Sequence, residues 1–152
     1  MAIADGGSTD NTREVIQAFA KAHPQLKVMV VDNPAVTIPA ALNTAIAATL
    51  GDVILRLDAH SAPDTDYVLL SVDALVTGKG DNVGGIWLIK QSEDHWIARS
   101  ISVSAANPIG VGNARYRYTD KAGYVDTVPF GCFYRSLIEK IGPFDENLLT
   151  NE

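Results

Sequence analysis

The sequence lacks several features that mark particular classes of protein. It has 152 residues, of which only one is a cysteine, Cys132, and 7% are aromatic. One cysteine excludes an intrachain disulfide and a cysteine-rich zinc site, and it favours a reducing compartment, so we expect a cytoplasmic protein. The longest apolar runs, such as residues 28–31 and 45–48, are far shorter than the roughly 18 residues that cross a bilayer. The sequence therefore predicts no transmembrane helix and no signal peptide.

Positive charge is also scarce. The chain has 12 Lys and Arg against 18 Asp and Glu, which gives a net charge of −6 at pH 7. Proteins that bind nucleic acid usually present a basic face to the phosphates, so no nucleic-acid partner is expected. With 47% hydrophobic and 20% charged residues, the composition is that of a folded globular protein. The length corresponds to about one domain of ordinary size.

The pattern of apolar residues predicts alternating strands and helices. Apolar and β-branched side chains run together in segments that we expect to be strands, at residues 1–4, 26–31, 52–57 and 83–90. Apolar residues recur at three- and four-residue intervals in the segments expected to be helices, at residues 11–22, at residues 39–50 and after Pro63. Strand, helix and strand in this length range form a βαβ unit. The sequence therefore predicts an α/β fold with a parallel sheet and right-handed crossovers.

Local signals refine these helices. Asn11 and Glu14 have the spacing of a capping box, and Gly51 is placed to end the second helix as a left-handed cap. The predicted buried stripe of the first helix is Val15, Ile16, Phe19 and Ala20. The predicted inward residues of the third helix are Tyr67, Leu70 and Val76, with Gly78 as its end.

The first acidic candidate lies at the end of the first strand. Asp5 is followed by the turn Gly6-Gly7-Ser8 and then by a helix. Ligands of open α/β sheets bind outside the carboxyl ends of the strands, and the backbone N–H groups of a helix N-terminus hold phosphates or polar rings. Asp5, Gly6 and Ser8 are therefore candidate nucleotide-binding residues. The alternative is a strand-to-helix turn without a ligand.

The second candidate is the group Asp58-Ala59-His60, which follows the strand predicted over residues 52–57. Strand alternation puts Asp58 and His60 on the same side, as two ligands of one cation require. A carboxylate and a neutral imidazole suit Mn²⁺ or Mg²⁺ whose other ligands are diphosphate oxygens. The alternative is that Asp58 caps the next loop and His60 is merely exposed.

Other polar or small residues leave two interpretations open. Gly84-Gly85 indicates either a close approach to a ligand or an ordinary turn. Arg115 and Arg117 either bind a diphosphate or an acceptor, or lie on the solvent-exposed face of a strand. Cys132, in an apolar strand without a nearby histidine, is expected to be a buried inert thiol.

Four motifs occur in the order that is typical of family 2 glycosyltransferases, and the sequence resembles that family on their account. They are residues 5–12 (DGGSTDNT), 57–60 (LDAH), 129–135 (PFGCFYR) and 141–146 (IGPFDE). Two further segments are similar to the succinoglycan-biosynthesis branch of the family, residues 110–116 (GVGNARY) and 125–131 (VDTVPFG). The resemblance extends from the first residue to the last.

The resemblance implies a GT-A fold, which is a Rossmann-like three-layer α/β/α sandwich, in one catalytic domain over residues 1–152. Its nucleotide-binding part would span about 1–90 and its acceptor-side part about 91–152. The implied activity is inverting transfer of a sugar from a nucleotide-sugar, expected to be a UDP-sugar, to a saccharide or lipid-linked saccharide in polysaccharide or exopolysaccharide biosynthesis. A divalent cation, Mn²⁺ or Mg²⁺, is implied as cofactor.

The resemblance also assigns roles to single residues. Asp5 would contact the uracil ring, and Asp58 the ribose or the metal. His60 stands where many members have the second aspartate of the Asp-X-Asp motif. On the acceptor side it implies Gly131, Cys132 and Arg135. Glu152 is a candidate near the position of the general base, because residues 151–152 match the start of a motif whose second acid is that base.

Compared with the family pattern, the sequence looks truncated at both ends, without the first strand and without the acid that follows Glu152. The full-length enzyme is expected at the inner face of the membrane. A strand without its neighbour would favour self-association through an exposed sheet edge.

Two other interpretations of the function stay open. One is a sugar nucleotidyltransferase, although no Gly-rich loop with Arg and Lys occurs near the amino end. The other is a folded fragment without activity.

Overall fold

The computed structural model describes residues 1–89 and 95–148, and these residues form two compact units. The first unit consists of Met1–Asp52 together with the residues from Arg135 onward, and the second of Val53–Tyr134. This boundary differs from the predicted functional division near residue 90. The division into a nucleotide-binding and an acceptor-side part therefore stays a prediction.

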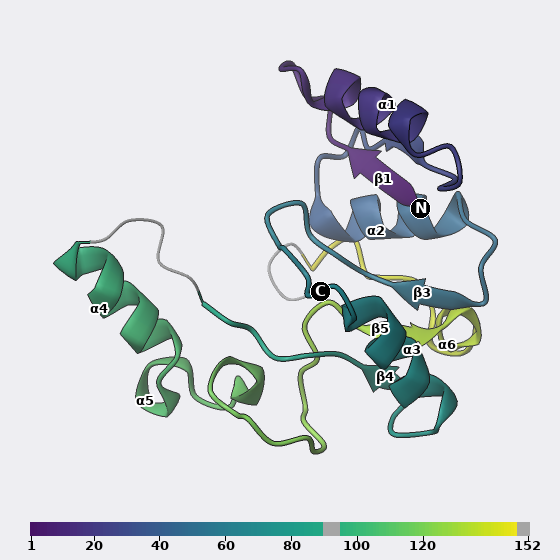
Figure 1. Cartoon of the computed structure of the whole chain (residues 1–152). Helices are drawn as coiled ribbons and strands as arrows, with labels where there is room; N and C mark the ends of the chain where they lie inside the picture. Colours follow the sequence, from purple (N-terminus) through teal and green to yellow (C-terminus); the bar gives the residue numbers. More distant parts are fainter. Residues whose placement is uncertain (90–94, 149–152) are drawn as a thin grey trace. The chain divides into compact units, whose positions relative to one another are not determined.

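The first unit contains a parallel strand pair (Figure 1). Its elements are β1 (Ala2–Asp5), α1 (Thr12–Ala22), β2 (Met29–Asp32), α2 (Ile38–Ala47) and α6 (Arg135–Ile141). β1 and β2 run parallel, with Asp5 opposite Asp32 at their carboxyl ends, and α2 packs against β1. The predicted strand–helix–strand unit with parallel strands is thus confirmed for β1, α1 and β2.

The second unit contains an antiparallel sheet of three short strands in the order β3-β5-β4. Its elements are β3 (Val53–Leu55), α3 (Tyr67–Val76), β4 (Asn82–Val83), α4 (Trp96–Ala105), α5 (Pro108–Val111), the 3₁₀ turn η1 (Arg115–Arg117) and β5 (Cys132–Tyr134). The sequence predicted that β2, α2 and β3 form a βαβ unit with parallel strands. This prediction is wrong for the described residues, because β3 pairs antiparallel with β5. Residue 133 lies opposite both residue 54 and residue 82.

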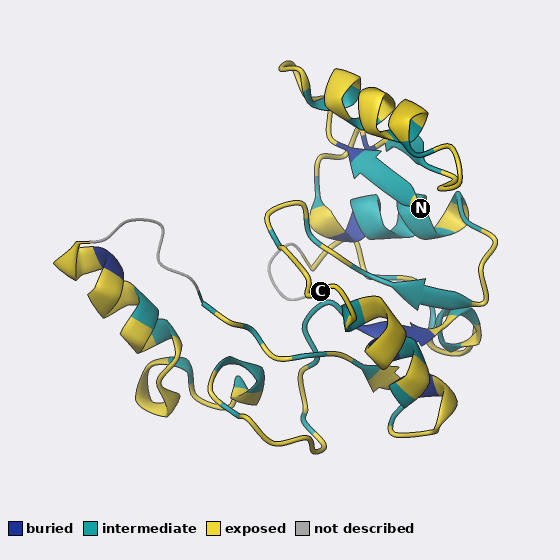
Figure 2. Ribbon diagram, in the orientation of Figure 1, coloured by how far each residue is buried: buried dark blue, intermediate teal, exposed yellow. Residues whose placement is uncertain are grey.

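The core of the second unit lies where α3 meets β5, and Figure 2 shows buried residues on both elements. Cys132 is 0% exposed and Leu75 is 3% exposed. On α3 the inward residues are Tyr67, Ser71 and Leu75, four residues apart. The prediction was right for Tyr67 and wrong for Leu70 and Val76, which are exposed. The prediction that α3 ends at Gly78 is confirmed by its positive φ of 73°.

The helices of the first unit differ from prediction in three respects. Val15 and Phe19 of α1 are exposed, because two four-residue strands offer little surface to an eleven-residue helix. The capping box is absent, and Asp10 instead accepts hydrogen bonds from the N–H and hydroxyl of Thr12. Gly51 is not a left-handed cap, because its φ is not positive, and Arg135 instead binds carbonyls in and after the last turn of α2. No helix among the described residues is long and apolar enough to span a membrane.

The pair Gly84-Gly85 is explained by a close approach within the chain itself. A Cβ at Gly84 would lie 2.6 Å from Val128 Cγ1 and 2.9 Å from the Pro129 carbonyl oxygen. A Cβ at Gly85 would lie 2.9 Å from the ring of Tyr67. The segment after β4 therefore passes too close to its neighbours for a side chain, and no ligand is needed to account for the glycines.

We expect Gly84→Ala to destabilise the chain by about 1–3 kcal/mol, because the added methyl must displace a backbone carbonyl as well as a side chain. The control is Gly123→Ala, since no atom lies within 4 Å of a Cβ there and φ is not positive. It should be neutral or slightly stabilising. Urea unfolding of both variants measures the difference, and equal midpoints would contradict the close-packing explanation.

Candidate functional site

Asp5 is a buried carboxylate at the end of β1, with a side chain only 4% exposed. Ser8 donates to it from its backbone N–H at 3.3 Å and from its hydroxyl. Arg13, in the first turn of α1, donates from Nε at 2.6 Å. The same guanidinium forms an ion pair with Asp32 at the end of β2. Asp5, Arg13 and Asp32 therefore form one cluster at the carboxyl ends of two parallel strands.

The sequence analysis identified Asp5 and Ser8 as site residues but did not identify Arg13 or Asp32. A signal was present, because the helix after the Asp5 turn begins at Thr12 and so places Arg13 beside the strand end. Asp32 could have been found from the parallel register, since both strands end in an aspartate. Two adjacent carboxylates repel each other, so a cation between them is expected.

The hydrogen bonds from Ser8 and then from Arg13 lower the pKa of Asp5 from 3.8 to about 2. A carboxyl group with a lowered folded-state pKa stabilises the fold above pH 3.8, and this contribution is lost as the pH falls towards about 2. Asp5→Asn removes the titrating group. We therefore expect the difference in urea midpoint between the parent and Asp5→Asn to shrink as the pH falls from about 4 to about 2. A difference that stays constant across this range would contradict the ion-pair assignment.

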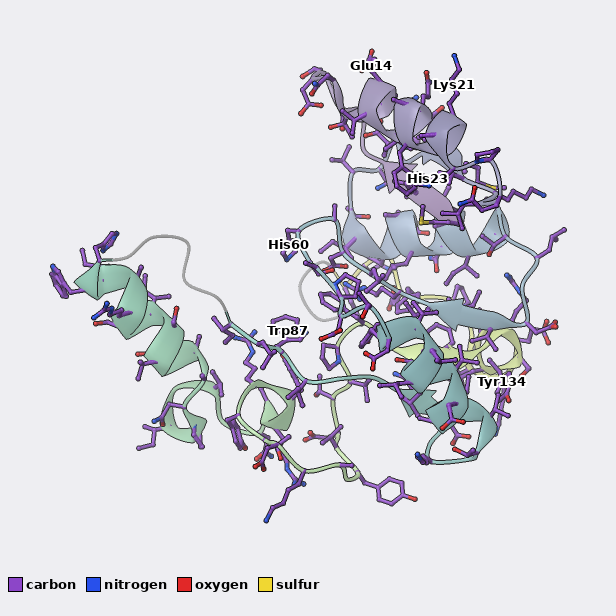
Figure 3. The ribbon with its side chains drawn as sticks, in the orientation of Figure 1. Glu14, Lys21, His23, His60, Trp87 and Tyr134 are labelled. Atoms are coloured by element: carbon purple, nitrogen blue, oxygen red, sulfur yellow. The ribbon has the colours of Figure 1, made fainter. Side chains whose placement is uncertain are left out.

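Asp58 begins the turn that follows β3, and His60 lies in it (Figure 3). The strand ends at Leu55, and the Asp58 carbonyl accepts the backbone N–H of Ser61 at 3.0 Å. Strand alternation therefore does not extend to these two residues, and their proximity follows from the turn. The Asp58 side chain is 28% exposed and accepts a hydrogen bond from Arg56 Nε at 3.2 Å. The side chain of His60 is exposed.

Arg135 has partners within the fold, and Cys132 is buried in it. The Arg135 guanidinium donates to the carbonyls of Ile46, Thr49 and Gly51 and to the Thr49 hydroxyl, at 2.8–3.1 Å. Cys132 is fully buried in β5, which confirms the predicted burial, and the burial raises the pKa of its thiol. Gly131 is buried beside the Asn82 side chain. An acceptor-side role for Gly131, Cys132 and Arg135 stays a prediction. Glu152 lies outside the described residues.

Arg115 and Arg117 lie in η1 and not on a strand face. The Arg117 guanidinium lies 4.8 Å from the centroid of the Trp87 ring, and Trp87 meets the Tyr116 ring edge-on at 5.1 Å. Arg115 Nη1 donates to the Tyr124 carbonyl at 3.3 Å. Both guanidinium groups therefore have partners within the second unit.

Comparison with known proteins identifies the family. The profile described as glycosyl transferase family 2 matches residues 1–142. The chain belongs to this family. Family 2 membership places the chain in the GT-A class, and its mixture of helices and strands agrees with the predicted α/β fold.

Curated proteins similar to this family 2 chain come from bacteria and archaea. The chain is 30% identical to the succinoglycan biosynthesis protein ExoA of Rhizobium meliloti strain 1021, over 99% of the chain and 45% of that protein. It is 25% identical to a dolichyl N-acetyl-alpha-D-glucosaminyl phosphate 3-beta-D-2,3-diacetamido-2,3-dideoxy-beta-D-glucuronosyltransferase of Methanococcus voltae, over 99% of the chain and 48% of that protein. It is 31% identical to glycosyltransferase AglE of Haloferax volcanii, over 97% of the chain and 46% of that protein.

The family 2 chain thus spans about half the length of the curated relatives that it matches. The search of solved structures found no significant match.

Members of family 2 typically depend on a divalent metal. In residues 1–89 and 95–148, no three His, Cys, Asp or Glu side chains are grouped to hold a metal ion. Asp58 and His60 supply one carboxylate and one imidazole from a single turn, and both types are ligands of Mn²⁺. The two residues fit a cation whose remaining ligands come from another molecule, such as the diphosphate of a donor.

Proposed function

We propose that the chain provides catalytic-domain residues, those of the donor site among them, of an inverting glycosyltransferase that moves a sugar from a UDP-sugar to a saccharide or lipid-linked saccharide acceptor. The observation that carries the proposal is the match to glycosyl transferase family 2 over residues 1–142. The site chemistry supports it, because acidic side chains follow two strands of the fold, at Asp5 and at Asp58. Such positions after strand ends are where α/β proteins bind nucleotides.

The nucleotide would be bound at Asp5, Gly6 and Ser8. Asp5 is held by Ser8 and Arg13 in its ionised form, which makes it a hydrogen-bond acceptor only. A uracil ring carries an N3–H that an ionised carboxylate can accept. The backbone N–H of Ser8 points to Asp5 and belongs to the turn before α1, whose N-terminus favours negative charge. This arrangement supports a uridine nucleotide as the donor.

Asp58 and His60 would hold the cation, Mn²⁺ or Mg²⁺, together with oxygens of the donor diphosphate. When bound, the cation would neutralise charge on the leaving diphosphate. Arg56 lies against Asp58 at 3.2 Å and keeps the carboxylate oriented in its turn. His60 would provide a nitrogen ligand through its imidazole ring.

Transfer with inversion needs an acceptor hydroxyl that attacks the anomeric carbon while the bond to the diphosphate breaks and a carboxylate takes the hydroxyl proton. Glu152 is a candidate that would lie near the position of this general base. The names of two relatives, one in succinoglycan biosynthesis and one acting on a dolichyl-linked sugar, support a polysaccharide or lipid-linked acceptor. With a lipid-linked acceptor, the whole enzyme would act at the inner face of the membrane.

The proposed function is tested by incubating the chain with two sets of substrates and measuring the UDP or pyrophosphate that is released. A mixture of UDP-sugars with saccharide acceptors should yield UDP, whereas UTP with sugar 1-phosphates should yield no pyrophosphate. Pyrophosphate release would instead indicate the sugar nucleotidyltransferase. Binding of UDP without release of UDP from any UDP-sugar would indicate the folded, inactive fragment.

Self-association through a sheet edge is a further part of this proposal. Among the described residues, β1 has β2 as its one hydrogen-bonded neighbour strand. An unpaired strand edge exposes N–H and C=O groups that can pair with another chain. We expect light scattering to detect dimers whose fraction increases with protein concentration. A strictly monomeric chain at high concentration would contradict this expectation.

A further inference from the structure

The two oxygens of the Asp5 carboxylate have different partners. Oδ2 accepts from Nε and Nη2 of Arg13, each at 2.6 Å. Oδ1 accepts the hydroxyl of Ser8. The Ser8 N–H lies 3.3 Å from both oxygens. One oxygen is therefore bound by a charged, two-point donor and the other by a neutral hydroxyl.

The two partners also differ in how easily they can be exchanged. Arg13 is held at its other end by Asp32, so turning it away from Asp5 would break two ion pairs. Ser8 is exposed, so its hydroxyl can replace its hydrogen bond to Asp5 with a hydrogen bond to water. Oδ1 is thus the oxygen that can change its partner, whereas Oδ2 stays bound.

We propose that Arg13 is a positioning residue for the nucleotide base: it fixes Asp5 through Oδ2, so that Oδ1 can exchange the Ser8 hydroxyl for an N–H of the base. The inference rests on the proposed binding of a uridine nucleotide at Asp5. Arg13 acts through Asp5 and does not itself contact the base. Ser8 fills the position of the base N–H when no nucleotide is bound.

The position of Asp32 explains why the fixing group is an arginine. Asp5 and Asp32 lie opposite each other in the register of β1 and β2, and Arg13 joins the two carboxylates. The planar guanidinium presents several N–H groups in a fixed geometry, so it can bind both acids at once. A lysine would supply the charge without that geometry. The cluster therefore sets the direction of the Asp5 carboxylate as well as its ionisation.

The discriminating measurement is the ratio of UDP affinity to CDP affinity, determined by calorimetry on the chain. Cytosine has no N3–H, so an acceptor oxygen favours uracil over cytosine. We expect Arg13→Gln to lower the ratio about tenfold, the effect of losing one well-placed hydrogen bond to a charged group. Arg13→Lys should restore part of it. The control Lys21→Gln removes one exposed positive charge from the same helix and should leave the ratio unchanged.

Ser8→Ala gives an independent test. The variant keeps the Ser8 backbone N–H, through which Ser8 belongs to the proposed site, and removes only the hydroxyl that donates to Oδ1. The ratio of UDP affinity to CDP affinity should therefore equal that of the parent or rise, whatever happens to the two affinities themselves. If Ser8→Ala no longer prefers UDP over CDP, the proposal that the base N–H replaces the Ser8 hydroxyl at Oδ1 is wrong. If circular dichroism shows that Arg13→Gln is unfolded, the UDP-to-CDP affinity ratios of Arg13→Lys and Ser8→Ala test the proposal instead. A parent-like ratio in Arg13→Lys would then overturn the positioning role.

Asp5→Asn separates this inference from the function on which it rests. A parent without preference for UDP, or an Asp5→Asn variant that keeps the preference, would overturn the uridine proposal and the inference with it. A loss of preference in Asp5→Asn with an unchanged ratio in folded Arg13→Gln would overturn the role of Arg13 alone. Equal weakening of UDP and CDP in Arg13→Gln would show general charge attraction and would also overturn the positioning role.

Discussion

Asp58→Ala is expected to lower the affinity of the chain for UDP in the presence of Mn²⁺ at least about tenfold, to the level that the parent shows in EDTA. The substitution removes the carboxylate that would join the cation to the protein, and without it the cation no longer strengthens the binding of the diphosphate. Calorimetry with and without Mn²⁺ measures the effect. His60→Ala should act in the same direction.

The control for Asp58 is Asp64→Ala. Asp64 lies in the same loop, is exposed, and uses its carboxylate to accept hydrogen bonds from Thr65. It should leave the effect of Mn²⁺ on UDP binding unchanged. If Asp58→Ala binds UDP as the parent does, with the same response to EDTA, the assignment of the metal site to this turn is wrong.

Arg135→Ala is expected to destabilise the chain by about 2–3 kcal/mol, because hydrogen bonds from a charged donor to backbone carbonyls are lost together. Four acceptors lose a hydrogen bond from Arg135, namely the Ile46, Thr49 and Gly51 carbonyls and the Thr49 hydroxyl, and of these the Ile46 carbonyl keeps its bonds from Thr49. The segment after α2 is then no longer tied to the start of α6. Thermal or urea unfolding measures the loss.

Lys140→Ala is the matched control, since it removes an exposed cation from the same helix, α6. Its effect should stay within about 0.5 kcal/mol, as for surface substitutions in general. If Arg135→Ala and Lys140→Ala unfold at the same urea concentration, the guanidinium does not stabilise the end of α2.

The elements that depend on local sequence were predicted well. The strand at β1, the helix α1 and the strand β2 follow from apolar runs and turn residues that lie next to each other in the chain, and their parallel pairing follows from the connecting helix. Pro39 lies in the first turn of α2 as expected, and Gly78 ends α3. In each case the deciding residue is within a few positions of the element that it controls.

Features that depend on distant residues were missed. The end of α2 was assigned to Gly51, but its carbonyls are bound by Arg135, 84 residues further along the chain. The antiparallel pairing of β3 with β5 joins residues about 80 positions apart, for which local periodicity gives no information. Strand lengths were overestimated for the same reason, since β4 extends only as far as β5 pairs with it.

For the site, the sequence indicated Asp5 through its position at a strand end but gave no reason to connect it with Arg13 and Asp32. That connection needs the register of β1 and β2 and the start of α1 in three dimensions. Asp58 and His60 were identified from strand alternation, which would have put both on one side of an extended strand. In the structure they lie instead in a turn after the strand.

The most direct test of the account is an isothermal titration of the chain with UDP, carried out once with Mn²⁺ and once with EDTA. The account predicts saturable binding of one UDP per chain in Mn²⁺ and clearly weaker binding in EDTA, with CDP bound less tightly than UDP in both. Absence of UDP binding in either condition, or equal affinity for UDP and CDP, would contradict the claim that this chain holds the donor site of a glycosyltransferase.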